Sequence, residues 1–256
     1  MSDIENPVIV ERFDGIMTIV LNRPEKLNAI TVGMAQAIAN ALDELDGDPA
    51  LSVGIITARG ARFCAGADVD GFLKEGVPRA GGRGSAGIAQ RPSTKPLIAA
   101  IEGLAIGGGF EIALSCDLIV AAEGAKFGLP EVKMGLAAAG GGLLYLSRLP
   151  AQIALELNLV GDPIPAERLH ELGLINRVVP AGQALAAAQA LARKIAQNAP
   201  LAVAAAKAVI RQCPTWGEDE RWERQAAITD AVTSSADAQE GFRSFKEKRK
   251  PVWAGK

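Results

Sequence analysis

Three short apolar segments, each closed by a glycine, constrain the fold of this chain more than any other feature. Each is followed within three residues by glycine, and the segments are residues 53–57, 97–101 and 118–122. Such short runs, apolar at nearly every position, are typical of parallel strands buried on both faces of a sheet. Helical segments lie between them, so the pattern predicts an α/β fold with a ββα-like alternation.

The N-terminal part adds two expected elements. Residues 8–21 predict a β-hairpin that turns at Asp14-Gly15, a dipeptide suited to tight turns. Thr31 is expected to cap a helix that continues to about Leu45, because apolar residues recur at helical spacing there.

After Pro150 the pattern becomes mainly helical. One more strand is expected at residues 174–179. Helices are expected over residues 153–160, 166–172, 185–195, 201–211, 218–233 and 236–249. This shift predicts two regions, an α/β core at residues 1–195 and a helical C-terminal region at residues 196–256.

Charge and cysteine content exclude several classes of protein. The net charge of −2 argues against non-specific electrostatic binding to nucleic acid or to an anionic membrane. No uncharged apolar run reaches membrane-spanning length, and Asp3 and Glu5 are unlike a signal peptide. The cysteines at 64, 116 and 213 form no CxxC pair, which suits a reducing compartment. We expect a soluble, cytoplasmic protein.

The chain has a single histidine, His170, in an expected surface helix. A serine triad would have to use it, and no G-x-S-x-G motif supplies the serine. A multi-histidine metal site is impossible, and we expect no metal.

Segment 74–96 is rich in glycine, proline and basic residues, and it predicts a flexible loop that is either a lid or disordered. Within it, Gly82-x-Gly84-x-x-Gly87 matches the dinucleotide-binding fingerprint. No strand precedes this match, and Pro92 follows where a helix should run, so a Rossmann oxidoreductase is disfavoured.

Two glutamates lie in unusual settings. Glu111 follows three glycines after an apolar strand, at the start of an expected apolar helix, where burying a carboxylate is costly. The glycines expose backbone N–H groups to a ligand, or they only relieve crowding at a strand–helix junction. Glu131 follows Pro130, so it acts either in catalysis or against a helix dipole. Two carboxylates in one pocket would suit acid–base chemistry.

Residues 63–68 form a second turn of small residues, and Asp68 is expected to cap a short helix to Leu73. Together with the glycine turn, this segment offers backbone N–H groups from two separate parts of the chain. That arrangement is the geometry of an oxyanion hole.

These motifs together resemble the enoyl-CoA hydratase/isomerase superfamily, which has the crotonase fold. The matching segments are residues 22–29, 63–68, 107–111, 116–117 and 127–131. The resemblance implies an acyl-CoA substrate, an oxyanion hole made by the N–H groups of Ala67 and Gly108, and a water held by Glu111 and Glu131. It implies reversible addition of that water to a trans-2-enoyl-CoA.

The resemblance also implies that no separate cofactor is needed, because coenzyme A is part of the substrate, and that the protein is a homotrimer or a dimer of trimers. Phe245 and Lys248 would reach a neighbouring subunit's coenzyme A, unless this basic run is only a solvated helix end. The other implied substrate or coenzyme A contacts are Lys26, Ala29, Ala65, Asp68, Pro130 and Ala139.

Two departures from the family pattern follow Glu131. Ala138-Ala139 replaces the usual Pro-Gly, and Tyr145 stands where arginine is frequent. We expect the backbone N–H of Ala139 to help hold the water. The C-terminal tail resembles carnitinyl-CoA dehydratase-like members. The alternatives to hydration are therefore dehydration of a substituted acyl-CoA, double-bond isomerisation, and acyl-CoA binding without catalysis.

Overall fold

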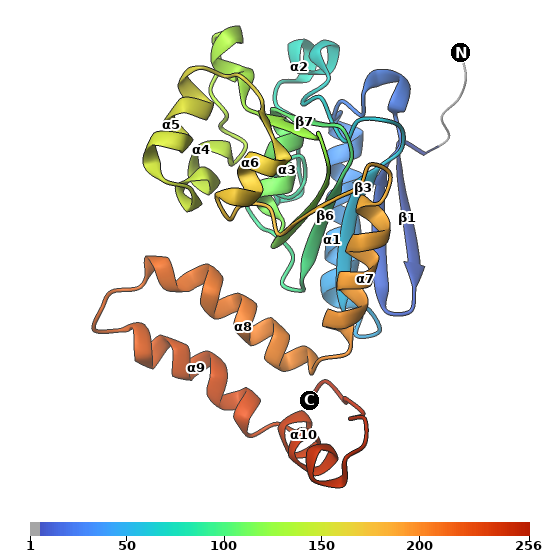
Figure 1. The fold of residues 1–256 in the computed structure, drawn as a ribbon, viewed down its shortest axis with the longest axis vertical. Coiled ribbons are helices and arrows are strands. Elements are labelled where there is room, and N and C mark those ends of the chain that lie inside the picture. The colour runs from blue at the N-terminus through green and yellow to red at the C-terminus, as the bar shows by residue number, and fades with distance from the viewer. Residues whose placement is uncertain (1–5) are drawn as a thin grey trace.

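A twisted six-stranded sheet lies at the centre of the computed structural model, which describes residues 6–256 (Figure 1). Its strands are β1 (Val8–Phe13), β2 (Ile16–Leu21), β3 (Val53–Ala58), β6 (Leu97–Ile101), β8 (Leu118–Ala122) and β11 (Arg177–Val179), adjacent in that order. β1 and β2 are antiparallel, whereas every later neighbouring pair is parallel. The α/β fold class is thereby confirmed.

The apolar segments form the buried parallel strands that the sequence predicts. All residues of β2 and β6 are buried, as are five of the six in β3. The hairpin turns at Asp14 and Gly15, both at positive φ. β11 is shorter than the predicted strand 174–179, because the N–H groups of Leu174 and Ile175 bond to the Leu169 carbonyl instead of the sheet.

A helix covers each face of the sheet. On one face α1 (Val32–Gly47) buries an apolar stripe that includes Ile38 and Leu42, and Thr31 caps it as predicted. On the other face α7 (Ala184–Ala196) packs Ala188 and Ala192 against the strands. Alanines at this spacing let the helix approach the sheet closely.

A smaller sheet lies beside the main one and leads into the candidate site. It is made of β7 (Leu104–Ile106), β9 (Lys126–Gly128) and β10 (Ile164–Pro165), with β9 in the middle. The short helix α3 (Gly108–Ser115) follows β7 after one residue. The remaining elements of the body are η1 (Pro24–Lys26), α2 (Val69–Glu75), η2 (Pro130–Met134), α4 (Gly142–Tyr145), η3 (Leu146–Arg148), α5 (Ala151–Leu159) and α6 (Ala166–Glu171).

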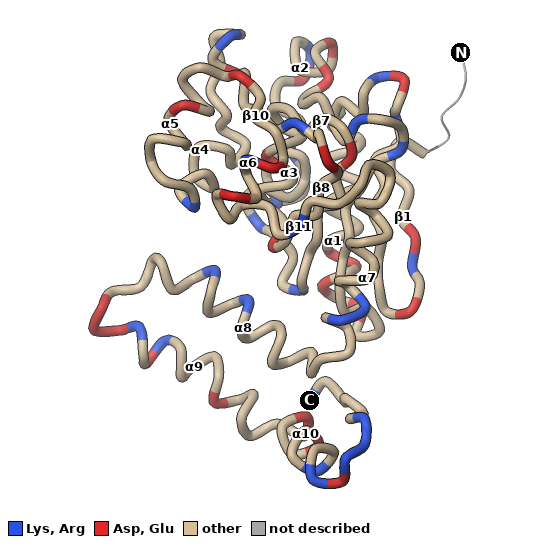
Figure 2. Tube along the Cα trace, viewed as in Figure 1, with Lys and Arg blue, Asp and Glu red and all other residues tan. Residues whose placement is uncertain are grey.

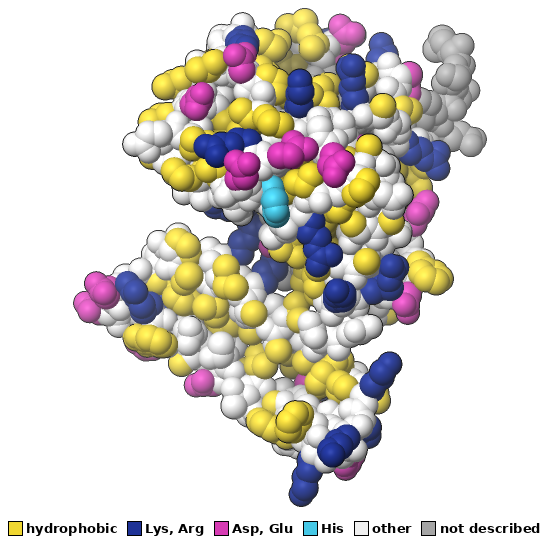
Figure 3. All heavy atoms as spheres, in the orientation of Figure 1, with side chains coloured by type: hydrophobic (Ala, Val, Ile, Leu, Met, Phe, Trp, Pro, Cys, Tyr) yellow, Lys and Arg dark blue, Asp and Glu magenta, His cyan; other side chains and the backbone are white. Residues whose placement is uncertain are grey.

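The last three long helices project from the body as an arm (Figure 1). They are α8 (Pro200–Gln212), α9 (Arg221–Thr233) and α10 (Ala236–Glu247), with the short η4 (Cys213–Thr215) between the first two. Apolar side chains lie on the surface of this arm (Figure 3), and Ile210, Trp222, Phe242 and Phe245 are each at least 70% exposed. The boundary between residues 195 and 196 stays a prediction.

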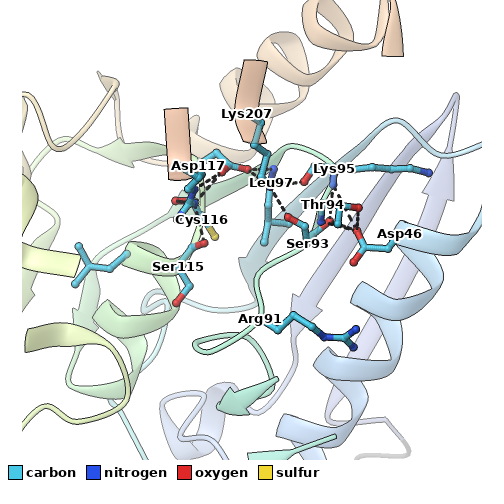
Figure 4. Close-up of polar contacts among 12 residues, drawn as sticks. Asp46, Arg91, Ser93, Thr94, Lys95, Leu97, Ser115, Cys116, Asp117 and Lys207 are labelled. Carbon is cyan, nitrogen blue, oxygen red and sulfur yellow. Dashed lines mark hydrogen bonds and ion pairs between the residues drawn. The ribbon is translucent and has the colours of Figure 1, made fainter. Parts of the chain in front are cut away.

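One part-buried cluster of charges joins the arm to the body (Figure 4). Asp117 accepts hydrogen bonds from Lys207 Nζ at 2.6 Å and Arg211 Nη2 at 2.7 Å, both on α8. The backbone N–H of Leu97 also donates to this carboxylate, at 2.8 Å. We call Asp117, Lys207 and Arg211 the Asp117 latch. Elsewhere basic and acidic residues are scattered along the chain, separated by stretches without charge (Figure 2).

Segment 74–96 is ordered, which corrects the prediction of a flexible loop. It contains a small hairpin of β4 (Arg79–Ala80) and β5 (Gly84–Ser85). Arg83 is fully buried, and its guanidinium binds Asp43 and Asp46. The Gly-x-Gly-x-x-Gly match arises from packing, because a Cβ on Gly87 would lie 2.0 Å from the Ala35 carbonyl oxygen of α1.

Two sequence expectations concern the surface and the N-terminus. His170 lies on the surface, as predicted (Figure 3), with its Nδ1 2.7 Å from the Ile175 carbonyl oxygen. Within residues 6–256, no helix is both long and apolar enough to cross a membrane. The expectation about a signal peptide rests partly on residues 1–5, which lie outside the described residues.

Candidate active site

The site is built where β7 passes into α3. Gly107 makes this turn at φ 54°, a conformation that favours glycine. A Cβ on Gly109 would lie 2.4 Å from the Cys64 carbonyl oxygen, so this glycine is needed for packing against segment 63–67. Crowding therefore explains Gly109, whereas Gly107 and Gly108 face the candidate site.

Two backbone N–H groups converge beside this turn. A Cβ on Gly108 would lie 3.8 Å from Ala67 N, and one on Gly66 would lie 3.6 Å from Gly108 N. Gly108 opens α3, so its N–H lacks an acceptor inside the helix. Within residues 6–256, neither the Ala67 nor the Gly108 N–H donates to another segment. Together they can stabilise a negative oxygen on a ligand.

Glu111 lies in the first turn of α3 and is only 6% exposed. Its Oε1 accepts a hydrogen bond from the Gly142 N–H at 3.0 Å. Burial raises the pKa of this carboxyl, and the Gly142 and Gly140 amides partly offset that rise. A carboxylate held in this way can exchange a proton near neutral pH more readily than a solvated one.

Glu131 lies in the first turn of η2, directly after Pro130. A Cβ on Gly107 would lie 3.1 Å from its Oε1, so the carboxylate sits against the glycine turn. Its Oε2 is buried and has no hydrogen-bond partner within residues 6–256. Burial, with a smaller contribution from the charge of Glu111, raises the pKa of Glu131 to about 6.

The structure therefore brings together the two glutamates and the two free N–H groups. The charge of Glu111 adds to the rise in the pKa of Glu131, so the two carboxylates lie close enough to interact. A buried carboxylate oxygen without a partner is costly unless a ligand or a water uses it.

The chain after Glu131 differs from the expectation for Ala139. Its N–H donates to the Ala137 carbonyl at 2.7 Å, so it already has an acceptor. The neighbouring glycines serve the site instead. A Cβ on Gly140 would lie 2.3 Å from Glu111 Oε2, and one on Gly142 would lie 3.2 Å from Glu111 Oε1. The role of Ala139 in holding water is thus not supported.

Tyr145, the second departure, joins α4 to segment 74–96. Its hydroxyl donates to the Ala89 carbonyl at 2.6 Å, and Arg148 lies 4.9 Å from the centre of its ring. Arg148 in turn donates to the Leu114 carbonyl, near the end of α3. The tyrosine therefore fixes the wall around Glu111.

The other predicted contact positions fall into two groups. Ala29 and Asp68 lie together, because Arg23 donates to the Ala29 carbonyl and to the Asp68 carboxylate. Asp68 also caps α2 by accepting from Gly71, as predicted. Lys26 is exposed and Ala65 is half-buried nearby, whereas Phe245 and Lys248 lie on or next to α10, far from the glutamates within one chain (Figure 1).

Ser85, which the structure places at the site, belongs to no motif that the sequence analysis singled out. Its Oγ would lie 2.6 Å from a Cβ on Gly140, beside Glu111 Oε2. The serine belongs to the segment predicted as a loop, and only pairing of β4 with β5 brings it there. Among residues 6–256, no group of three or more His, Cys, Asp or Glu side chains could hold a metal ion.

Comparison with known proteins agrees with this geometry. A model of the enoyl-CoA hydratase/isomerase family matches residues 11–256. The crystal structure of enoyl-CoA hydratase EchA1 from Mycobacterium marinum is 49% identical, with a TM-score of 0.95 over 98% of this chain and 99% of that one. Enoyl-CoA hydratase EchA19 from Mycobacterium tuberculosis is 40% identical over 95% of this chain and 94% of its own length.

A carnitinyl-CoA dehydratase from Salmonella enteritidis is also 40% identical, over 94% of this chain and 95% of its own length. The family model matches residues 11–256, almost the whole chain. The sequence identity of these relatives, at least 40%, is too high for similarity of fold alone. This chain belongs to the enoyl-CoA hydratase/isomerase family.

Proposed function

We propose that the protein is an enoyl-CoA hydratase, which reversibly adds water to a trans-2-enoyl-CoA to give a 3-hydroxyacyl-CoA. The observation that carries this proposal is the buried, unpartnered Oε2 of Glu131 next to Glu111 and two free N–H groups. A pair of carboxylates can bind a water and move its protons, and the N–H groups can hold the thioester oxygen. Relatives named enoyl-CoA hydratase support the same reaction.

The Ala67 and Gly108 amides would bind the thioester oxygen. As water adds to C3, negative charge moves onto that oxygen, and the two N–H groups stabilise it as an enolate. One such donor is worth about 3–4 kcal/mol of transition-state stabilisation in other enzymes. Gly108 opens α3, and the chain at Ala67 is held by backbone hydrogen bonds that join Ile30 to Gly66 and Asp68. Both donors are therefore fixed and need no reorganisation during the reaction.

Glu111 and Glu131 would share the proton transfers. One carboxylate accepts a proton from the attacking water, and a proton is delivered to C2 of the enolate. The raised pKa of Glu131, about 6, keeps its proton affinity close to what such transfers need at neutral pH. Coenzyme A enters as part of the substrate, so no separate cofactor is proposed.

Dehydration of a substituted acyl-CoA is the second candidate. The 40% identity to carnitinyl-CoA dehydratase favours it, together with the resemblance of the tail. The same four groups would catalyse the reverse of hydration, by removing a proton from C2 and releasing the C3 hydroxyl as water. Isomerisation and acyl-CoA binding alone are less favoured, since neither requires both carboxylates.

A panel of trans-2-enoyl-CoA esters of increasing chain length would test the proposal. We expect the absorbance of the conjugated thioester to fall for at least one member, with the 3-hydroxyacyl-CoA identified by mass spectrometry. Carnitinyl-CoA, offered in parallel, would report dehydration through a rise in the same absorbance. If the protein converts none of these esters, the hydratase proposal is wrong.

We further propose a homotrimer, or a dimer of trimers, in the cytoplasm. The exposed apolar side chains of the arm support an assembly, because surfaces of this kind are usually buried in an interface. An assembly would also give Phe245 and Lys248 access to a neighbouring subunit's coenzyme A. Light scattering coupled to gel filtration tests the oligomer, and a monomeric mass would contradict it.

A further inference from the structure

A serine hydroxyl that the proposed mechanism does not use lies beside Glu111. A Cβ added to Gly140 would lie 2.6 Å from Ser85 Oγ and 2.3 Å from Glu111 Oε2. The two oxygens thus share the small space above the Gly140 Cα. Within residues 6–256, the Ser85 hydroxyl has no hydrogen-bond partner, and its residue is only half-buried. It is therefore free to bind a group at the site.

The backbone that carries Ser85 is fixed on three sides. Two residues earlier, the buried Arg83 binds the α1 carboxylates. Two residues later, Gly87 packs on α1 so closely that no side chain fits. Beyond it, the Ala89 carbonyl accepts from the Tyr145 hydroxyl at 2.6 Å. Ser85 is thereby held at the carboxylate by contacts that do not involve its own side chain.

We propose that Ser85 is a positioning residue that donates a hydrogen bond to Glu111 Oε2 through one bridging water. This inference rests on the proposed function, because it assigns Ser85 a role in the acid–base chemistry of Glu111. The Gly142 amide already serves Oε1 at 3.0 Å. The Gly140 amide also favours the charged form of Glu111, and a further donor on Oε2 fixes the plane of the carboxylate and favours that form more.

The surroundings of Glu111 leave room for such a donor. The titratable group nearest to it is Glu131, from η2, whose own pKa is raised in part by the charge of Glu111. The segment leading into α4 contributes only backbone amides. The cations Arg148 and Arg211 bind carbonyls at the opposite end of α3, those of Leu114 and Ser115. Within residues 6–256, no ion pair joins a cation to this carboxylate, so loss of the hydroxyl should change its proton affinity.

Three variants test the assignment on an enoyl-CoA that the wild-type protein hydrates. Ser85→Ala should lower kcat by on the order of tenfold, the effect of losing a hydrogen bond to a charged group, with KM nearly unchanged. Ser85→Thr keeps the hydroxyl and should restore most of the rate. Ser147→Ala removes an exposed hydroxyl that bonds to the Leu144 carbonyl, and it should have no effect.

A titration that needs no activity separates this inference from the proposed function. Carbon-13 NMR of protein labelled at the glutamate carboxyls would follow Glu111, whose signal is identified by its loss in Glu111→Gln. We expect Ser85→Ala to move the Glu111 midpoint upward by about one pH unit, and Ser85→Thr to return it. An unchanged midpoint and an unchanged kcat in Ser85→Ala would overturn the role of Ser85. Failure of wild-type protein on every ester, with the midpoint shift present, would count only against the hydratase proposal.

Discussion

Carboxylates lie in two contrasting settings within this molecule. In the Asp117 latch, one carboxylate receives hydrogen bonds from Leu97, Lys207 and Arg211, so both its oxygens are satisfied. At the candidate active site, Glu131 Oε2 has no partner within residues 6–256, and the neighbouring charge is another glutamate. The latch is neutralised by the protein itself, whereas the active site is left to be completed by a ligand.

This difference explains why similar burial serves architecture in one place and chemistry in the other. A buried carboxylate between two cations holds its charge and fixes the elements around it. One that lacks partners keeps a raised pKa and a site for water. Sequence position alone does not separate the two cases, because Asp117 and Glu111 belong to the same continuous stretch.

The largest effect should come from removing either active-site carboxylate. Glu111→Gln and Glu131→Gln should each lower the hydration rate by about 10²–10⁴-fold, because a proton-transfer group is lost without a large change in shape. Binding of a CoA ester, measured by calorimetry, should persist. Wild-type rates in both variants would show that the pair is structural.

Asp117→Ala should have the largest effect on folding. It removes the carboxylate that accepts from Lys207 and Arg211, two part-buried cations that keep hydrogen bonds to backbone carbonyls. Losing hydrogen bonds to a charged group costs about 1.5–3 kcal/mol of unfolding free energy. Denaturant unfolding at fixed protein concentration measures it. Asp162→Ala is the matched control, because it removes an exposed ion pair with Lys133 and should cost less than about 1 kcal/mol. An equal loss of unfolding free energy in the two variants would show that the Asp117 latch stabilises the fold no more than an exposed ion pair does.

Gly140→Ala should lower activity while leaving the fold intact. The added Cβ would lie 2.3 Å from Glu111 Oε2, so the carboxylate must move. A displacement of about 1 Å costs up to about 10²-fold in rate. Gly47→Ala provides the control, since nothing lies within 4 Å of its added Cβ. Normal kcat in Gly140→Ala, measured with a saturating enoyl-CoA, would mean that the exact placement of Glu111 is unimportant.

The smallest effect concerns stability against pH. The pKa of Glu131 is raised to about 6 from 4.5, so the folded protein binds more protons than the unfolded chain between these values. Its contribution to stability is therefore lost as pH rises through this range. Glu131→Gln should remove this loss. The free energy of unfolding of the variant minus that of the wild-type protein should therefore be about 1–2 kcal/mol larger at pH 7 than at pH 4.5. Denaturant unfolding at both values checks it, and a constant difference between the proteins would contradict it.

Much of the fold follows from local patterns in the sequence. The strands of the main sheet other than β11, and the cap at Thr31, are predicted because apolar periodicity and capping depend on neighbouring residues. Segment 74–96 is the main error. Its glycines and basic residues suggest flexibility, but they serve packing on α1 and the burial of Arg83 by Asp43 and Asp46, about forty residues earlier in the chain.

The candidate site divides in the same way. Glu111 stands out in the sequence because a carboxylate in an apolar helix needs a reason, and the two turns of small residues suggest exposed amides. Ser85 and Gly140 carry no such signal. They are seen only when the hairpin of β4 and β5 meets the chain before α4.

The sequence by itself indicated the α/β class, the unusual setting of Glu111 and the two turns of small residues, because each depends on local composition and backbone preference. The resemblance to a family added Glu131 and the Ala67 and Gly108 amides. Only the tertiary structure decided which buried carboxylate is paired and which is open. That distinction depends on donors from distant segments, namely Lys207 and Arg211 for Asp117 and the Gly142 amide for Glu111. Hydrogen-bond partners so far apart in the chain are fixed by packing, and no local pattern encodes them.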